Sequence, residues 1–144
     1  MRPLALLPAV LPLLLSCGGE HDSTTKASPK GEGPLFTPVP AERSGITFTN
    51  TITESPELNY FTYVYAYNGG GVAVGDIDGD GLQDVYFTGN QVGDRLYRNL
   101  GGLKFEDITD KAIGAKAHEG WHTGVTMADV DNDGRPDIYV CRSG

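Results

Sequence analysis

The feature that most constrains this chain is a nine-residue aspartate pattern that occurs twice. It reads D-I-D-G-D-G-L-Q-D from Asp76 to Asp84, and D-V-D-N-D-G-R-P-D from Asp129 to Asp137, 53 residues later. Carboxylates packed this closely repel one another unless a cation neutralises them, and Ca²⁺ accepts six to eight oxygen ligands in a flexible shell. Because the whole pattern recurs, we interpret it as two equivalent calcium loops and not as a solvated acidic turn.

Each loop offers carboxylates at positions 1, 3, 5 and 9 and a glycine at position 6, where a sharp turn lets the next backbone carbonyl face the ion. The predicted ligands of the first site are the carboxylates of Asp76, Asp78, Asp80 and Asp84 and the carbonyl of Leu82. Those of the second site are the carboxylates of Asp129, Asp131, Asp133 and Asp137 and the carbonyl of Arg135. The turn glycines are Gly81 and Gly134. Asn132 stands where Gly79 stands, and asparagine tolerates positive φ.

The residues around the loops decide the class of calcium protein. An EF-hand needs flanking helices and a glutamate at loop position 12, but that position holds Phe87 in the first loop and Val140 in the second. Dockerin-like and thrombospondin-type repeats fail the same test. Short β-branched and aromatic runs, at Val72–Val74 and Asp84–Phe87, favour strands on either side of the first loop. The loop is therefore expected at the tip of a β-hairpin.

Two further strands are predicted after the first hairpin, at Asp94–Arg98 and Leu103–Asp107, joined through N-L-G-G at residues 99–102. The first repeat then has four antiparallel strands, the number in one propeller blade.

The stretch G-G-G-V-A-V-G-D-I-D-G-D-G followed by R-L-Y-R-N-L-G-G-L-K-F-E-D-I-T resembles the FG-GAP/VCBS repeat of integrin-α-like β-propellers. It is most similar to bacterial relatives of cartilage acidic protein, which often carry a C-terminal ASPIC/UnbV module that this sequence does not contain. The resemblance covers residues 35–144 and implies an all-β, seven-bladed propeller. The sequence has room for about two blades, a first repeat at about 69–114 and an incomplete second at about 122–144. We therefore expect an N-terminal fragment whose remaining blades are missing.

Three more strands are expected before the first blade. Leu35–Ile46 aligns with Lys104–Gly114, which predicts an orphan outer strand at residues 35–39 of the kind that closes a propeller ring. A second strand is expected at Thr47–Thr53. A third is expected at Phe61–Tyr67, where alternation gives one aromatic face. That face suits either packing between blades, its commoner use, or stacking against sugars.

The N-terminus has the anatomy of a lipoprotein signal. Residues 1–16 hold one basic residue, Arg2, and an apolar run too short for a transmembrane helix. The run ends in L-L-S-C, which looks like a bacterial lipobox and would place a diacyl anchor on Cys17; the alternative is an ordinary secretory peptide with a chance cysteine. Residues 17–34 lack large apolar side chains and should form a flexible tether. Cys141, in a predicted strand, is expected to be buried.

One motif points elsewhere. His118-Glu119-Gly120-Trp121-His122 matches the H-E-x-x-H signature of zinc proteases, whose two histidines bind metal from one helical face. Gly114 and Gly120 disfavour a helix there, and the only other histidine, His21, lies in the tether. We interpret the match as a coincidence.

These observations predict a calcium-binding, lipid-anchored β-propeller of the bacterial cell envelope, at the outer membrane or cell surface. It would act as a binding, adhesion or scaffold module for a protein or glycan, with structural calcium and no catalysis. The net charge of −8 argues against nucleic acid as a partner. Two alternatives stay open, a zinc metalloprotease and a module that contacts glycans through calcium.

Overall fold

The computed structural model describes residue 34 and residues 36–143. The chain divides into two units, Met1–Thr37 and Pro38–Gly144, and the second contains all of the described helices and strands. The expected signal peptide, Cys17 and most of the tether lie outside the described residues. Of the helices in the described part, none has both the length and the apolar character needed to span a bilayer.

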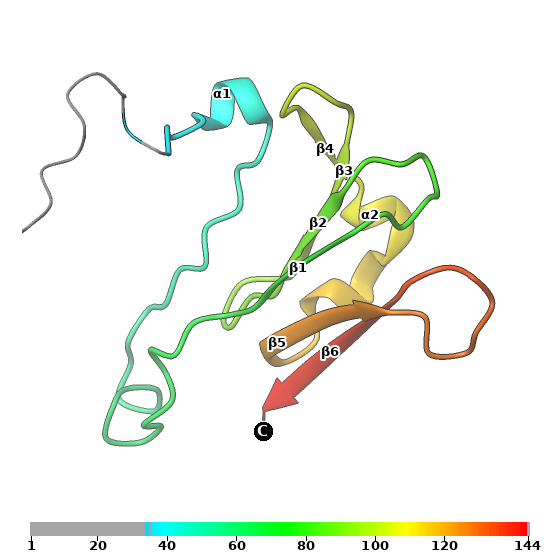
Figure 1. Ribbon diagram of the computed structural model, residues 1–144. Helices are drawn as coiled ribbons and strands as arrows, with labels where there is room; N and C mark the ends of the chain where they lie inside the picture. The colour runs from blue at the N-terminus through cyan, green and yellow to red at the C-terminus, as the bar shows by residue number, and fades with distance from the viewer. Residues whose placement is uncertain (1–33, 35, 144) are drawn as a thin grey trace, which may run out of the picture. The chain divides into compact units, whose positions relative to one another are not determined.

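The first repeat is a four-stranded antiparallel sheet with strands in sequence order (Figure 1). The strands are β1 (Val72–Gly75), β2 (Asp84–Phe87), β3 (Arg95–Asn99) and β4 (Phe105–Asp107). β1 and β2 pair in the register that sets Gly75 opposite Asp84, so the first aspartate loop joins them at the hairpin tip. The predicted hairpin and four-stranded blade are confirmed.

The second repeat contributes one hairpin, β5 (Trp121–Ala128) and β6 (Asp137–Ser143), whose tip is the second aspartate loop. The helix α2 (Thr109–Ala112) and the 3₁₀ helix η1 (Gly114–His118) lead from β4 to β5. In the described part of the chain, β6 pairs with β5 alone. A four-stranded sheet plus a hairpin in a mostly β protein is consistent with propeller blades, which confirms the expected fold class.

The core lies between the two repeats. Ala73, Tyr86 and Leu96 of the sheet are buried, and apolar side chains of β5 and β6 pack against them: Val125, Met127, Ile138 and Val140. The backbones approach closely at Gly71, where an added Cβ would lie 2.9 Å from the backbone nitrogen of Val125. The contact between repeats therefore requires glycine at that position.

The strand expected at Thr47–Thr53 is wrong. The segment is extended, but its polar contacts are made by side chains and not by a backbone ladder. The Thr47 N–H donates to the Tyr97 hydroxyl (3.2 Å), and Asn50 and Asn90 exchange hydrogen bonds of 2.7 and 3.0 Å. Phe48 stacks on Phe87 with ring centroids 5.1 Å apart. The segment therefore contacts β2 and β3 through side chains, and no described strand forms a ladder with it.

The strand expected at Phe61–Tyr67 is also wrong, because this segment forms consecutive turns. The Tyr63 N–H donates to the Asn59 carbonyl (2.9 Å) and the Ala66 N–H to the Tyr63 carbonyl (3.0 Å). The side chain of Asn59 accepts from the N–H groups of Phe61 and Thr62, and the Asn59 N–H donates to the Thr62 hydroxyl. Such local side-chain bonds compete with a sheet ladder.

The alignment of residues 35–46 with residues 104–114 holds for the helix and fails for the strand. The helix α1 (Ala41–Ser44) and Gly45 (φ 78°) repeat the arrangement of α2 and Gly114 (φ 64°). Residues 36–39 are not in a strand, because no described strand lies beside them as β3 lies beside β4. Cys141 lies in β6 as expected but is exposed, so its predicted burial is wrong.

Candidate metal centres

The first loop is folded by hydrogen bonds from its own backbone to its aspartates. The carboxylate of Asp76 accepts from the N–H groups of Gly79 (2.8 Å), Asp80 (3.1 Å) and Gly81 (2.8 Å). Gly79 and Gly81 both have positive φ, at 78° and 86°. The left-handed conformations turn the loop back on itself and bring its N–H groups to the first aspartate.

Asp84 closes the first loop from inside the protein. Its side chain is fully buried, and its two oxygens accept from the backbone N–H groups of Ile77 (3.0 Å) and Asn99 (2.8 Å). Asn99 ends β3, and its side-chain amide also donates to the carbonyl of Gln83 (2.8 Å). The third strand of the blade therefore fixes the last carboxylate of the loop.

Among the described residues, the second loop repeats most of this network, without the bond from a third strand and without a bond from position 4 to the first aspartate. Asp129 accepts from the N–H groups of Asp133 (3.1 Å) and Gly134 (2.9 Å), and Asp137 accepts from Val130 (3.1 Å). Asn132 occupies the loop position that Gly79 has in the first loop, and its φ of 62° is positive, as predicted. Asp137 has no described counterpart to the bond that Asn99 gives Asp84.

Each loop gathers three carboxylates around one point. Oxygens of Asp76, Asp78 and Asp84 lie within 4.8 Å of one another, and so do oxygens of Asp129, Asp131 and Asp137. An all-oxygen set of carboxylates fits a hard cation such as Ca²⁺ better than zinc or copper. The donors present therefore fit the predicted ion.

The fourth predicted carboxylate of each loop, Asp80 or Asp133, is not a member of its triad. Asp80 and Asp133 each use one carboxylate oxygen to accept the backbone N–H two residues ahead, at 2.8 and 2.9 Å. Their part in binding, and that of the carbonyls of Leu82 and Arg135, stays a prediction.

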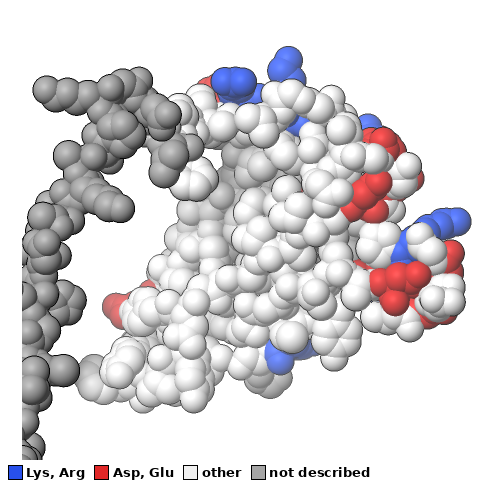
Figure 2. Space-filling model, viewed as in Figure 1, with Lys and Arg blue, Asp and Glu red and all other residues white. Residues whose placement is uncertain are grey.

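The two loops lie side by side. A groove of about 510 Å³ separates them, lined by Asp76 and Asp78 of the first loop and by Gly134, Arg135 and Pro136 of the second. Figure 2 shows the acidic side chains gathered in two neighbouring patches at this end of the molecule. Both candidate sites therefore open at one edge of the repeats.

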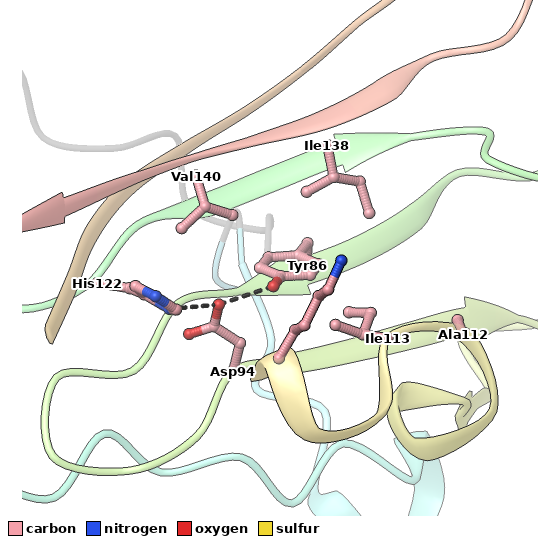
Figure 3. A pocket seen from close by; sticks show the side chains of 8 residues that line it. Tyr86, Asp94, Ala112, Ile113, His122, Ile138 and Val140 are labelled. Carbon is pink, nitrogen blue, oxygen red and sulfur yellow. Dashed lines mark hydrogen bonds and ion pairs between the residues drawn. The ribbon is translucent and has the colours of Figure 1, made fainter. Parts of the chain in front are cut away.

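A buried polar cluster joins the two repeats at the other side of the core, and the sequence patterns did not predict it. Asp94, which is 1% exposed, accepts from the Tyr86 hydroxyl (2.7 Å) and the Gly89 N–H (2.8 Å), and its carboxylate also bonds His122 Nδ1 at 2.7 Å (Figure 3). Burial of the Tyr86 hydroxyl, and next its bond to Asp94, raise the pKa of Tyr86. No local motif connects Asp94 to His122, because 28 residues separate them.

His122 lies in this cluster, and the H-E-x-x-H match that contains it does not form one helix. His118 ends η1, Gly120 has φ 97°, and His122 lies in β5. The two histidines therefore do not share one face of a helix, the geometry that the zinc signature requires.

Similarity to known proteins lies in the segment that contains both aspartate loops. Residues 76–140 match the family model described as FG-GAP-like repeat. No curated protein and no solved structure matches the chain.

Proposed function

We propose that this chain, whose residues 76–140 match the FG-GAP-like repeat, is a calcium-dependent binding module of an integrin-α-like, seven-bladed β-propeller. The observation that carries the proposal is the pair of aspartate triads at the tips of equivalent hairpins. Each triad would hold one Ca²⁺.

The role of the ions would be structural. Three carboxylates with oxygens within 4.8 Å repel one another, and the cost falls when a divalent cation lies between them. The outer ligands in each loop belong to the ends of the two paired strands or adjoin them, Asp76 beside β1 and Asp84 in β2. A bound ion would therefore hold the hairpin closed.

We assign the chain a binding or scaffold role without catalysis. The two histidines of the zinc signature lie on different elements, and His122 already bonds Asp94. The partner would be a protein or a glycan. A net charge of −8 disfavours nucleic acid.

Calorimetric calcium titration of the full chain tests the metal role. We expect two bound ions, and each should raise the free energy of unfolding by about 2.7 kcal/mol when free calcium exceeds its dissociation constant by about a hundredfold. The double substitution Asp76→Asn and Asp129→Asn should abolish both. Asp110→Asn, an exposed aspartate of α2, is the matched control and should change neither. A folded chain that takes up no calcium would refute the proposal.

We further propose that the protein is exported and anchored to the bacterial envelope through diacylated Cys17, at the outer membrane or cell surface. The support is the L-L-S-C sequence that ends the apolar run at residues 4–15. Two acyl chains give durable membrane attachment. Cys17→Ser should move the protein from the membrane to the soluble fraction. Mass spectrometry that finds a mature N-terminus at another residue, without lipid, would contradict the anchor.

A further inference from the structure

The turns at residues 60–67 carry an exposed aromatic surface. Five large apolar side chains within these eight residues are more than half exposed, and Phe61 is 93% exposed. We call this set the aromatic surface; its members are Tyr60, Phe61, Val64, Tyr65 and Tyr67. Contiguous exposed apolar side chains of this kind mark interaction sites.

The aromatic surface stands on a fixed base. Tyr63 packs edge-to-face on Trp121 of β5 with ring centroids 5.4 Å apart, and its hydroxyl shares a 2.6 Å hydrogen bond with Ser143. Ala66 is buried, and the Asn59 side chain holds the first turn. The exposed rings are therefore presented by a segment that is already ordered, which lowers the entropic cost of binding.

The segment that carries the aromatic surface contains acidic residues and no basic ones, while Arg142 of β6 adjoins Ser143 at its base. Between Arg43 and Arg95 the sequence contains no lysine or arginine. Glu54 accepts a hydrogen bond from the Tyr67 hydroxyl, which sets a carboxylate at the edge of the surface, and Glu57 is exposed nearby in sequence. Aromatic faces are themselves electron-rich, so rings and carboxylates both attract a cation.

The ring geometry favours a cationic side chain over a sugar. Tyr60 meets Phe61 at 75°, and Tyr65 meets Tyr63 of the base at 76°, so neighbouring rings are steeply inclined and do not form a flat platform. The face of a single exposed ring suffices for a compact ammonium or guanidinium group. We propose that the aromatic surface binds a lysine- or arginine-bearing segment of a partner protein. This inference rests on the proposed binding role and names the chemistry of its partner.

The test is a binding titration of the full chain with a short peptide of alternating lysine and serine, in saturating calcium so that calcium occupies the aspartate loops. The matched probe is the same peptide with every lysine acetylated. We expect the cationic peptide to bind and the acetylated peptide not to bind. Raising the salt concentration should weaken binding, because both carboxylates are exposed.

Substitutions locate the binding. Phe61→Ser with Tyr65→Ser should weaken peptide binding by about tenfold, since two cation–π contacts are lost, and Glu54→Gln should weaken it less. Phe36→Ser with Tyr139→Ser is the matched control, because these residues are 88% and 62% exposed outside the aromatic surface, and it should leave binding unchanged. Phe61→Ser alone is a second variant, since its ring is almost fully in solvent.

Four outcomes would overturn the inference. No weakening by either pair of substitutions would mean that the peptide is held by general charge attraction. Binding of neutral glycans that Phe61→Ser abolishes would mean a sugar site. Self-association by light scattering that Phe61→Ser abolishes would mean that a second copy covers the surface. Calcium uptake with no peptide binding would leave the proposed metal role standing and remove this partner.

Discussion

Asp84 and Asp137 end the same nine-residue pattern, yet the structure surrounds them differently. Asp84 is fully buried and accepts N–H groups from Ile77 and from Asn99 at the end of β3. Asp137 is not buried and accepts only from Val130 within its own loop, among the described residues. The difference shows that the loop sequence sets the fold of the hairpin tip, while the third strand sets how firmly its last ligand is held.

The residues two positions further along β2 and β6 show the same contrast. Tyr86 is 3% exposed and donates to Asp94, whereas Tyr139 is 62% exposed. Equivalent residues of the two repeats thus have opposite environments, because one lies in a complete sheet against a neighbouring hairpin and the other in a two-stranded hairpin. Matched substitutions at such pairs of residues can therefore test how much the third strand contributes.

The largest effect is expected from removing the last ligand of each loop. Asp84→Ala leaves two N–H groups without their acceptor in a buried site, and we expect a loss of about 2–4 kcal/mol in the free energy of unfolding together with loss of the first calcium site. Asp137→Ala should cost about 0.5 kcal/mol without calcium, because its site is open to water. Chemical denaturation of both variants with and without calcium measures this. Equal losses would mean that β3 does not fix Asp84.

Calcium affinity should follow the same order. Preorganised ligands lose less freedom on binding, so the first loop should bind calcium more tightly than the second. Asp76→Asn should remove the tighter of two calorimetric transitions and Asp129→Asn the weaker. If Asp76→Asn removed the weaker binding step and Asp129→Asn the tighter one, the contact of β3 with Asp84 would not raise calcium affinity.

A smaller effect is expected for the tyrosines, and it depends on pH. Because the folded pKa of Tyr86 is raised, the unfolded chain releases this proton first, so the stabilisation is full below about pH 10 and is lost as pH rises above it. Tyr86→Phe should cost about 1–2 kcal/mol at neutral pH and flatten the decline above pH 10. Tyr139→Phe should keep that decline. If the free energy of unfolding falls equally steeply with pH in Tyr86→Phe and in the parent chain, a group other than Tyr86 causes the decline.

Much of the blade could be predicted from sequence, because its determinants are local. The aspartate pattern and the flanking β-branched runs predicted the hairpin from β1 to β2, and the same pattern located β5 and β6. Asn99 escaped prediction, since its backbone N–H reaches Asp84 from 15 residues away and no side chain signals it.

The two strands that were predicted wrongly share one physical cause. Strands were expected at Thr47–Thr53 and, from alternation, at Phe61–Tyr67, but a strand also needs a ladder partner, which a local sequence pattern cannot supply. Side-chain hydrogen bonds from Asn50 and Asn59 took its place. The cluster around Asp94 is non-local too, because Tyr86 and His122 reach it from different repeats.

The smallest effect concerns position 4 of the loops, where the two repeats differ in residue type but agree in conformation. Gly79 has φ 78° and Asn132 has φ 62°. Nothing lies within 4 Å of a Cβ added at Gly79, so a substitution there meets only backbone strain. Gly79→Ala should therefore cost about 1 kcal/mol, whereas Gly79→Asn should cost a few tenths, because asparagine adopts the left-handed conformation more readily.

The reciprocal change sharpens this prediction. Asn132→Gly should leave stability within about 0.5 kcal/mol of the parent chain, and Asn132→Ala should be the worse of the two. Thermal melts in saturating calcium measure all four variants under one condition, so that differences in metal occupancy do not mask the backbone effect. If alanine were tolerated as well as asparagine at both positions, the residue at position 4 would not determine the conformation that the two loops share. The shared conformation would then follow from the carboxylate hydrogen bonds of Asp76 and Asp129 alone.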